Sequence, residues 1–224
     1  MWQLYQFPLC PFSRKVRLLL GEKGIEHELV RETPWSRRDE FFDLNPAGQT
    51  PVLADTNRRT ILIDSGAICE YFEETVDRAP MLGGGAAARA EVRRLVAWLD
   101  ERLYADFVAP IMIERMRKRL VSREAPDTKV LRDALRMADQ HLDYLDYRLD
   151  HYRWLGGPVL SLADLAAAAH LSVADYLGGL DWRGHKQTME WYSSMKSRPS
   201  FRTLLSDRME VIAPPAHYDK VDFG

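Results

Sequence analysis

One stretch, Asn45–Leu53 with the sequence Asn-Pro-Ala-Gly-Gln-Thr-Pro-Val-Leu, constrains the fold of this chain most strongly. Its first half favours a turn, because Pro46 and Gly48 are loop formers, and its second half begins an apolar strand. A proline that starts a strand cannot donate to the ladder, so Pro51 marks a sheet edge, a strand start or a cis peptide bond. With a cis bond, the backbone of Thr50 would turn outward and pair with an extended peptide. An ordinary loop before a strand is the alternative.

Around this stretch, residues 1–80 predict a small α/β unit. The aromatic-rich run from Trp2 to Phe7 alternates and suits a strand. A helix begins at Cys10-Pro11, with proline at the first helical position, and ends at Gly24. The other expected elements are a strand at 25–30, a short helix at 39–44, an antiparallel hairpin at 52–54 and 60–63, and a helix capped by Ser65.

A linker separates this unit from an all-helical half. Pro80 and the glycines at 83–85 break the pattern, and beyond them apolar residues recur every three or four positions. One such seam runs from Leu131 to Tyr152, and Ser161 with Asp164 forms a capping box before a nearly all-apolar helix. We therefore divide the chain into a domain at 1–80, a linker at 81–85, a helical domain at 86–208 and a tail at 209–224.

Charge and cysteine usage exclude several classes of function. The formal net charge of -2 gives no electrostatic case for binding nucleic acid or an anionic membrane. With only Cys10 and Cys69, a disulfide framework is not expected, and a reducing compartment fits. The histidines at 141, 151 and 170 are too scattered to predict a metal site. The first residues lack a signal-peptide layout, and no apolar stretch is long enough to span a bilayer, so we expect a cytoplasmic protein.

Cys10 is the strongest candidate for chemistry. It lies just before a helix, where free N–H groups and the helix dipole favour a thiolate that can attack a disulfide. Ser13, one turn later, is a candidate hydroxyl donor to a bound thiolate. The alternative is that Cys10 is a small half-buried residue at the helix start. Cys69 falls on the apolar side of its helix and is expected to be buried and inert.

Several separated motifs resemble one known superfamily. Cys10-Pro-Phe-Ser13, then Gln49-Thr-Pro51, then Asp64-Ser65 occur in the order seen in the thioredoxin-like half of glutathione transferases. Ser161-Leu-Ala-Asp164 resembles the folding box of that superfamily's helical domain. The resemblance spans roughly residues 2–206. It implies a thioredoxin-like α/β N-terminal domain, an all-α C-terminal domain and a two-fold homodimer.

The resemblance also implies a glutathione site. Thr50 would pair with the cysteinyl backbone of glutathione, Pro51 would be cis, and Gln49 would face the glycyl carboxylate. Asp64 would face the γ-glutamyl amine, and Ser65 would bind the γ-glutamyl carboxylate at a helix N-terminus. The alternatives are that Asp64 is a solvated turn residue and that Ser65 is only a helix cap.

An enzymatic role would use Cys10, by similarity to omega-like transferases, as a glutathione transferase or thiol transferase. Ser13 occupies the place where dithiol relatives carry a second cysteine, so Cys10 has no local resolving partner. Glutathione is therefore an optional ligand in our prediction, and no cofactor is required. Relatives that no longer catalyse a reaction keep the same motifs as structural residues.

Two aromatic segments favour a protein partner instead. Trp35 stands beside arginines in the loop Thr33–Arg38, and Trp and Arg are common binding anchors. It can equally fold back on its own domain. The proline- and aromatic-rich tail contains Tyr218, Asp222 and Phe223 as candidate partner contacts.

Together these segments resemble the transferase-like division proteins of alphaproteobacteria. That resemblance implies FtsZ as a partner, a location at the division site, promotion of filament curvature or bundling, and signalling to septal wall synthesis through the tail. The basic run Glu114–Arg119 is interpreted as a solvated helix face or as a contact for an acidic partner.

Overall fold

The computed structural model describes residues 1–220, so the predicted contacts Asp222 and Phe223 lie outside the described residues. A four-stranded sheet with the order β2-β1-β3-β4 organises the N-terminal half. β1 is parallel to β2 and antiparallel to β3, and β3 is antiparallel to β4. The elements are β1 (Trp2–Gln6), α1 (Pro11–Lys23), β2 (His27–Arg31), α2 (Asp39–Leu44), β3 (Val52–Asp55), β4 (Ile61–Ile63) and α3 (Ser65–Thr75).

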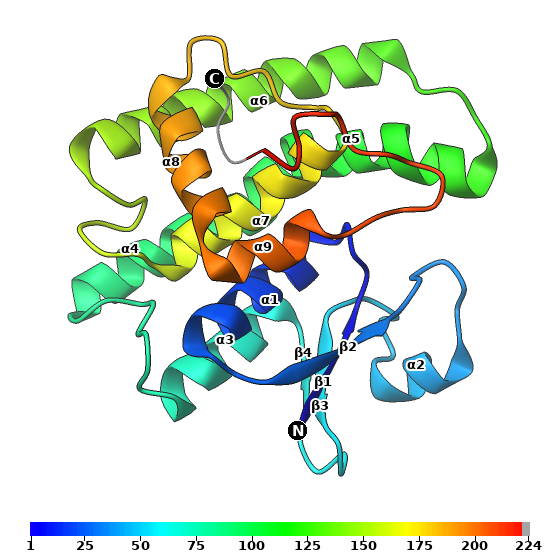
Figure 1. The fold of residues 1–224 in the computed structure, drawn as a ribbon, viewed down its shortest axis with the longest axis vertical. Coiled ribbons are helices and arrows are strands. Elements are labelled where there is room, and N and C mark those ends of the chain that lie inside the picture. Colours follow the sequence, from blue (N-terminus) through cyan, green and yellow to red (C-terminus); the bar gives the residue numbers. More distant parts are fainter. Residues whose placement is uncertain (221–224) are drawn as a thin grey trace.

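Helices make up the second half of the chain (Figure 1). Right-handed helical backbone angles at Ala97, Val108 and Met112 join four of its segments into one continuous rod. Within that rod, η1 and η2 are wider π-helical turns. The elements are α4 (Ala86–Ala97), η1 (Trp98–Val108), α5 (Ala109–Met112), η2 (Ile113–Ser122), α6 (Thr128–His151), α7 (Leu162–Tyr176), α8 (Lys186–Ser197) and α9 (Pro199–Leu205).

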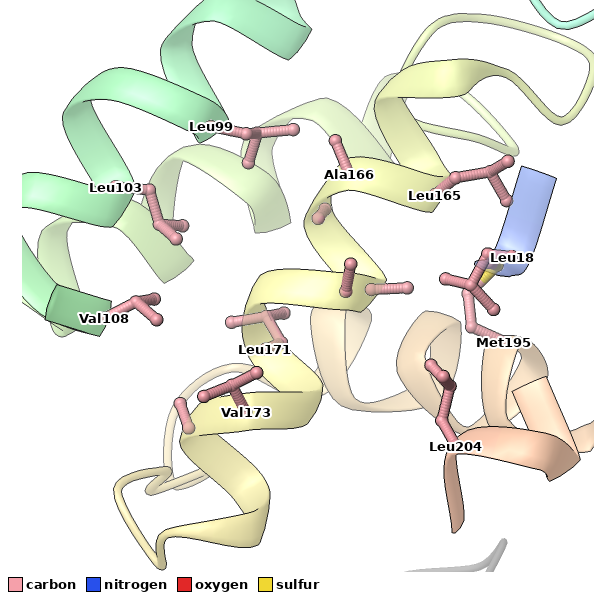
Figure 2. Packing of buried hydrophobic residues seen from close by; sticks show 14 of the residues in the cluster. Leu18, Leu99, Leu103, Val108, Leu165, Ala166, Leu171, Val173, Met195 and Leu204 are labelled. Carbon is pink, nitrogen blue, oxygen red and sulfur yellow. The ribbon is translucent and has the colours of Figure 1, made fainter. Parts of the chain in front are cut away.

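Helix α7 is the centre of the core, because all of its residues are buried. Its many alanines have short side chains, so α1, α4 and η1 pack closely against it. Figure 2 shows Leu99, Leu103 and Val108 on one side of α7, and Leu18, Met195 and Leu204 on the other. The two halves therefore share one apolar core, to which the sheet contributes Leu4 and Leu53.

The capping box at the start of α7 is present, as predicted. Asp164 accepts hydrogen bonds from the backbone N–H of Ser161 at 2.9 Å and from its hydroxyl at 2.8 Å. The same carboxylate accepts from the N–H of Leu155 at 2.8 Å and from Trp191 Nε1 at 3.0 Å. One buried carboxylate thus fixes the loop before α7 and the neighbouring helix α8.

Basic residues of α1 join the two halves. Arg14 and Arg17 are buried and both pair with Asp207, at 3.2 and 2.8 Å. Buried Lys15 pairs with Asp100 of η1. The polar side of α1 therefore faces the helical domain and not solvent.

Two sequence expectations need correction here. The seam along α6 buries Leu142 and Leu145, but Leu135 and Tyr152 are exposed, because α6 packs mainly on η1 and α8. Tyr218, predicted as a partner contact, is fully buried. Its hydroxyl lies 3.1 Å from Arg14 Nη1, and its ring meets the edge of another tyrosine ring, so it anchors the tail over the helical half (Figure 1).

The described part of the chain contains no helix that is both long and apolar enough to cross a bilayer. Across residues 1–220, no group of three or more His, Cys, Asp and Glu side chains is arranged to hold a metal ion.

Candidate functional site

A cleft of about 700 Å³ opens between the N-terminal domain and the long helical rod. Cys10, Trp35 and Thr50 belong to its N-terminal wall, and Tyr104, Met112 and Met116 belong to the opposite wall. Its other lining residues are Phe7, Phe12, Pro34, Gly48, Gln49, Asp100, Ala109, Ile113 and Arg117. The cleft brings together residues that the sequence analysis placed in a glutathione site and in a partner site.

Cys10 occupies the N-cap position of α1, half-buried at the cleft wall. Its Sγ lies 3.5 Å from the carbonyl oxygen of Thr50, close enough for a weak hydrogen bond. No acidic side chain lies in the first turn of α1, so the positive end of the helix dipole is not neutralised there. The thiol is thus placed at a helix N-terminus and open to the cleft.

Ser13 does not face the cleft. It is fully buried, and its hydroxyl has no hydrogen-bond partner among the described residues. Ser13 is absent from the described lining of the cleft, and its role as a donor to a bound thiolate stays a prediction that the described residues do not test.

The turn before β3 holds the peptide-pairing candidates. The Asn45 side chain donates to the carbonyl of Gln49 at 2.8 Å and accepts from Ala47 N–H at 3.0 Å, which closes the turn. The Thr50–Pro51 peptide bond is cis, one of the three arrangements considered for this proline. Thr50 and the exposed Gln49 both line the cleft.

A second hollow of about 380 Å³ adjoins the cleft, because both are lined by Phe12 and Asp100. It contains Asp64 and Ser65, the predicted γ-glutamyl contacts. Asp64, and not Ser65, caps α3: its Oδ1 accepts from the N–H groups of Gly66 and Ala67 at 2.7 and 3.2 Å. Ser65 is the buried first residue of α3, so the reading of Ser65 as only a cap is wrong.

The charge of this hollow is mostly negative. Its one described cation, Arg93, is held by both oxygens of Glu70 at 2.8 Å. The hollow is also lined by the carboxylates of Asp64, Asp100 and Glu101. The hollow therefore offers several carboxylates that can accept from the amine of a γ-glutamyl group, but only one described cation for its carboxylate.

Asp100 is fixed where the two hollows meet. It pairs with Lys15 and lies 3.0 Å from His170 Nε2. Burial alone would raise the pKa of Asp100, but the His170 hydrogen bond and the Lys15 charge hold that pKa below its ordinary value. Burial lowers the pKa of His170. The carboxylate thus stays ionised at the floor of the site.

Tyr104 brings a phenol close to the thiol. Its ring lies 4.8 Å from that of Phe12 and 5.8 Å from that of His170. Burial, together with the charge of nearby Cys10, raises the pKa of Tyr104, so the hydroxyl stays protonated and can donate. The sequence analysis missed Tyr104, Asp100 and His170, because they reach the site only when the helical domain docks.

Trp35 is half-buried and packs edge-on against Phe7, with ring centroids 5.1 Å apart. It therefore folds back on its own domain while also lining the cleft. The next loop residue but one, Arg37, lies over the ring of Phe42, with its Cζ 5.6 Å from the centroid. The loop is thus held in place beside the cleft mouth.

Known proteins share this architecture. The family model of the glutathione S-transferase N-terminal domain matches residues 9–75. FtsZ-localized protein A of Caulobacter vibrioides is 43% identical over 222 residues, covering 98% of this chain and 97% of that protein. This chain belongs to the glutathione S-transferase superfamily.

Solved structures of this superfamily have the same fold. A glutathione S-transferase from Rhodospirillum rubrum F11 superposes with a TM-score of 0.97 at 44% identity, covering 100% of both chains. FzlA from C. crescentus gives a TM-score of 0.97 at 43% identity, covering 99% of both. A relative matched by sequence, glutathione S-transferase omega-2 of Mus musculus, is 26% identical over 92% of this chain and 79% of that protein. The predicted transferase fold is confirmed.

Two other sequence predictions now have structural answers. Burial raises the pKa of Cys69 to about 12, so this thiol, the second of the chain, is inert at neutral pH. The basic run is partly structural: Arg115 donates to the carbonyl of Leu177 at 2.7 Å, and Lys118 pairs with Glu114 at 2.7 Å. Arg117 remains exposed and lines the cleft.

Proposed function

We propose that this transferase-fold protein is a cell-division scaffold that binds FtsZ filaments. The observation that supports this most is the 43% identity to FtsZ-localized protein A over almost the whole of both chains. We further propose that the chain is not dedicated to catalysis, because a scaffold needs a shaped surface and no chemical step.

The cleft mouth is our proposed contact surface for the filament. Trp35 supplies an apolar ring on one side, and exposed Ile113 supplies apolar surface on the other. Arg37 and Arg117 are exposed beside them. Aromatic and arginine side chains around a groove suit an acidic protein partner, because the ring gives buried area and the guanidinium gives charge-assisted hydrogen bonds.

A two-fold homodimer would present two such surfaces and could cross-link or bend filaments without chemistry. In this proposal the protein works at the division site, and the end of the tail, including Asp222 and Phe223, contacts proteins of septal wall synthesis. Since Tyr218 is buried, it would act there only by fixing the tail.

Sedimentation with GTP-assembled FtsZ tests the proposal. We expect the protein to pellet only with filaments, and we expect Trp35→Ala to weaken this binding at least about tenfold, as loss of a binding anchor does. Tyr147→Ala is the matched control, since Tyr147 is an exposed aromatic residue on α6, outside the described lining of the cleft. If the protein does not pellet with filaments, the proposal of a scaffold is wrong. If both variants lose filament binding equally, with folding verified by circular dichroism, only the assignment of Trp35 to the contact surface is wrong.

The second candidate is a glutathione-dependent enzyme that uses Cys10. The observation that favours it is the Cys10 thiol at a helix N-terminus, beside Thr50 and the cis bond that follows it. Retention on immobilised glutathione that is lost in Ser65→Ala, with disulfide turnover that is lost in Cys10→Ser, would support it. Filament binding that survives Cys10→Ser would separate the scaffold from this chemistry.

A further inference from the structure

A separate pocket of about 300 Å³ lies between the loop before α7 and the end of α8. None of its lining residues belongs to the cleft or to the hollow beside it. It is lined by Arg153, Trp154, Trp191, Ser194, Ser197 and Arg198. The pocket thus combines two flat aromatic rings with two guanidinium groups, which suit a ligand that is both aromatic and anionic.

The pocket's walls are rigid before any ligand arrives. Trp154 and Gly157 exchange two backbone hydrogen bonds of 3.0 Å, and Arg148 holds the carbonyl of Leu155 at 2.8 Å. Trp191 is 5% exposed and donates its indole N–H to buried Asp164 at 3.0 Å. The Trp191 ring and the backbone that carries Trp154 are therefore fixed, which reduces the entropy lost on binding.

Arg198 is also oriented in advance. Glu22 of α1 grips its Nε and Nη2 at 2.7 Å each, and Ser200 donates to the same carboxylate at 2.6 Å. Burial would raise the pKa of Glu22, but these hydrogen bonds hold it below its ordinary value, so the pair stays ionic. The Arg198 Cζ lies 5.8 Å from the centroid of the Trp154 ring, which places the guanidinium against an aromatic face.

Arg153 gives the pocket a surplus of positive charge. It is exposed, and no carboxylate of residues 1–220 lies within ion-pairing distance of it. Of the two arginines in the wall, only Arg198 is neutralised by an acidic partner. A guanidinium with five donors and no acceptor nearby favours a carboxylate or another planar oxyanion.

We propose that this pocket is a binding site for a small aromatic carboxylate, distinct from the glutathione-family cleft. The aromatic ring of the ligand would lie against Trp154 and Trp191, and its carboxylate would bind Arg153. The volume suits about one ring with its anionic group, at the lower end of known small-molecule sites. The Ser194 and Ser197 hydroxyls, which donate within α8, keep lone pairs that can accept from a ring substituent.

Benzoate is the test ligand, and ¹⁹F NMR of the protein labelled with 5-fluorotryptophan is the readout, because each of the 6 tryptophans gives its own signal. We expect benzoate to shift the signals of Trp154 and Trp191 while that of Trp35 stays in place. Benzamide, which has the same shape without the charge, should not produce these shifts. Shifts at Trp35 alone, equal shifts with benzamide, or no shift at millimolar benzoate would overturn the proposal.

Arg153→Gln should weaken benzoate binding about tenfold, the effect of losing one hydrogen bond to a charged group. Arg153 is exposed, so this variant should fold normally. Arg183→Gln is the matched control, because Arg183 is an exposed loop arginine outside the pocket. If both variants bind benzoate as the unaltered protein does, the carboxylate is not held by Arg153 and the assignment is wrong.

Discussion

Single residues in this protein carry roles that depend on their buried surroundings, and His185 is an example. Its side chain is 3% exposed. Its Nε2 lies 2.8 Å from Asp139, and its Nδ1 lies 3.2 Å from Asp146 and 3.7 Å from Asp143. Burial lowers the pKa of His185, but the hydrogen bonds to Asp139 and Asp146 prevail and raise it. His185 therefore ties α6 to the start of α8, and the two carboxylates favour its protonated form.

This pair of helices should lose stability as the pH rises. Because the folded-state pKa of His185 is raised, its contribution is complete below the unfolded value of about 6.5 and is lost as the pH rises through the folded-state pKa. Urea unfolding should show a gap in unfolding free energy between the unaltered protein and His185→Gln near pH 5.5, and that gap should narrow toward about pH 9. A gap that does not change with pH would contradict the ionic role.

Local rules for single residues also explain which site residues could be predicted from the sequence. Cys10 and Pro51 act through local rules for a helix start and a strand start, so their positions could be predicted from neighbours in the chain. The same rules predicted the cap of α3 one residue late, at Ser65 instead of Asp64. Tyr104 and His170 obey no local rule. They join the site only because α7 packs against α1 and η1 packs against α7, and a periodic pattern does not say which helices pack together.

Among the elements, helix α1 shows how a glycine permits close packing. It packs on α7 and α9, and Gly21 lies where α1 meets the start of α9. A Cβ at Gly21 would lie 2.9 Å from the Ser200 Cβ and 3.1 Å from its Cα. Helix propensity favours alanine at this position, whereas the packing against backbone atoms requires glycine.

The packing effect should win over the helix propensity. Alanine gains about 1 kcal/mol of helix propensity over glycine, but overpacking a closed contact costs about 1–3 kcal/mol. We expect Gly21→Ala to reduce the free energy of unfolding by about 1 kcal/mol, measured by urea denaturation. Gly84→Ala is the control, since nothing lies within 4 Å of a Cβ there, and it should be neutral or slightly stabilising. A stabilised Gly21→Ala protein would show that α9 moves aside freely.

At the scale of the whole molecule, the two domains share one apolar core. The apolar cluster runs without interruption from Leu4 and Phe7 in the N-terminal domain to Leu165 and Tyr192 in the helical domain. Contiguous cores unfold together when the shared interface is large relative to either part. The linker at 81–85 separates the domains in sequence, but it does not separate their cores.

Urea should therefore produce one transition. With 5-fluorotryptophan labelling, the signals of Trp2 and Trp35 in the N-terminal domain should disappear over the same urea range as those of Trp98 and Trp191 in the helical domain. Coincident transitions are the standard sign of two-state unfolding. Earlier loss of the Trp2 and Trp35 signals would show that the transferase-type α/β domain unfolds independently.

The buried cations of α1 have a consequence for the geometry of the cleft. Apolar surfaces alone would let two domains slide past each other at little cost, because hydrophobic attraction has no direction. The ion pairs of Arg14, Arg17 and Lys15 with residues of the helical domain fix the relative position of the two domains. A small shift of one domain against the other would leave a desolvated charge without its partner. The distance between Cys10 and the far wall is thus held mainly by charges behind the cleft, so the lining residues other than Asp100 are free to diverge without altering its dimensions.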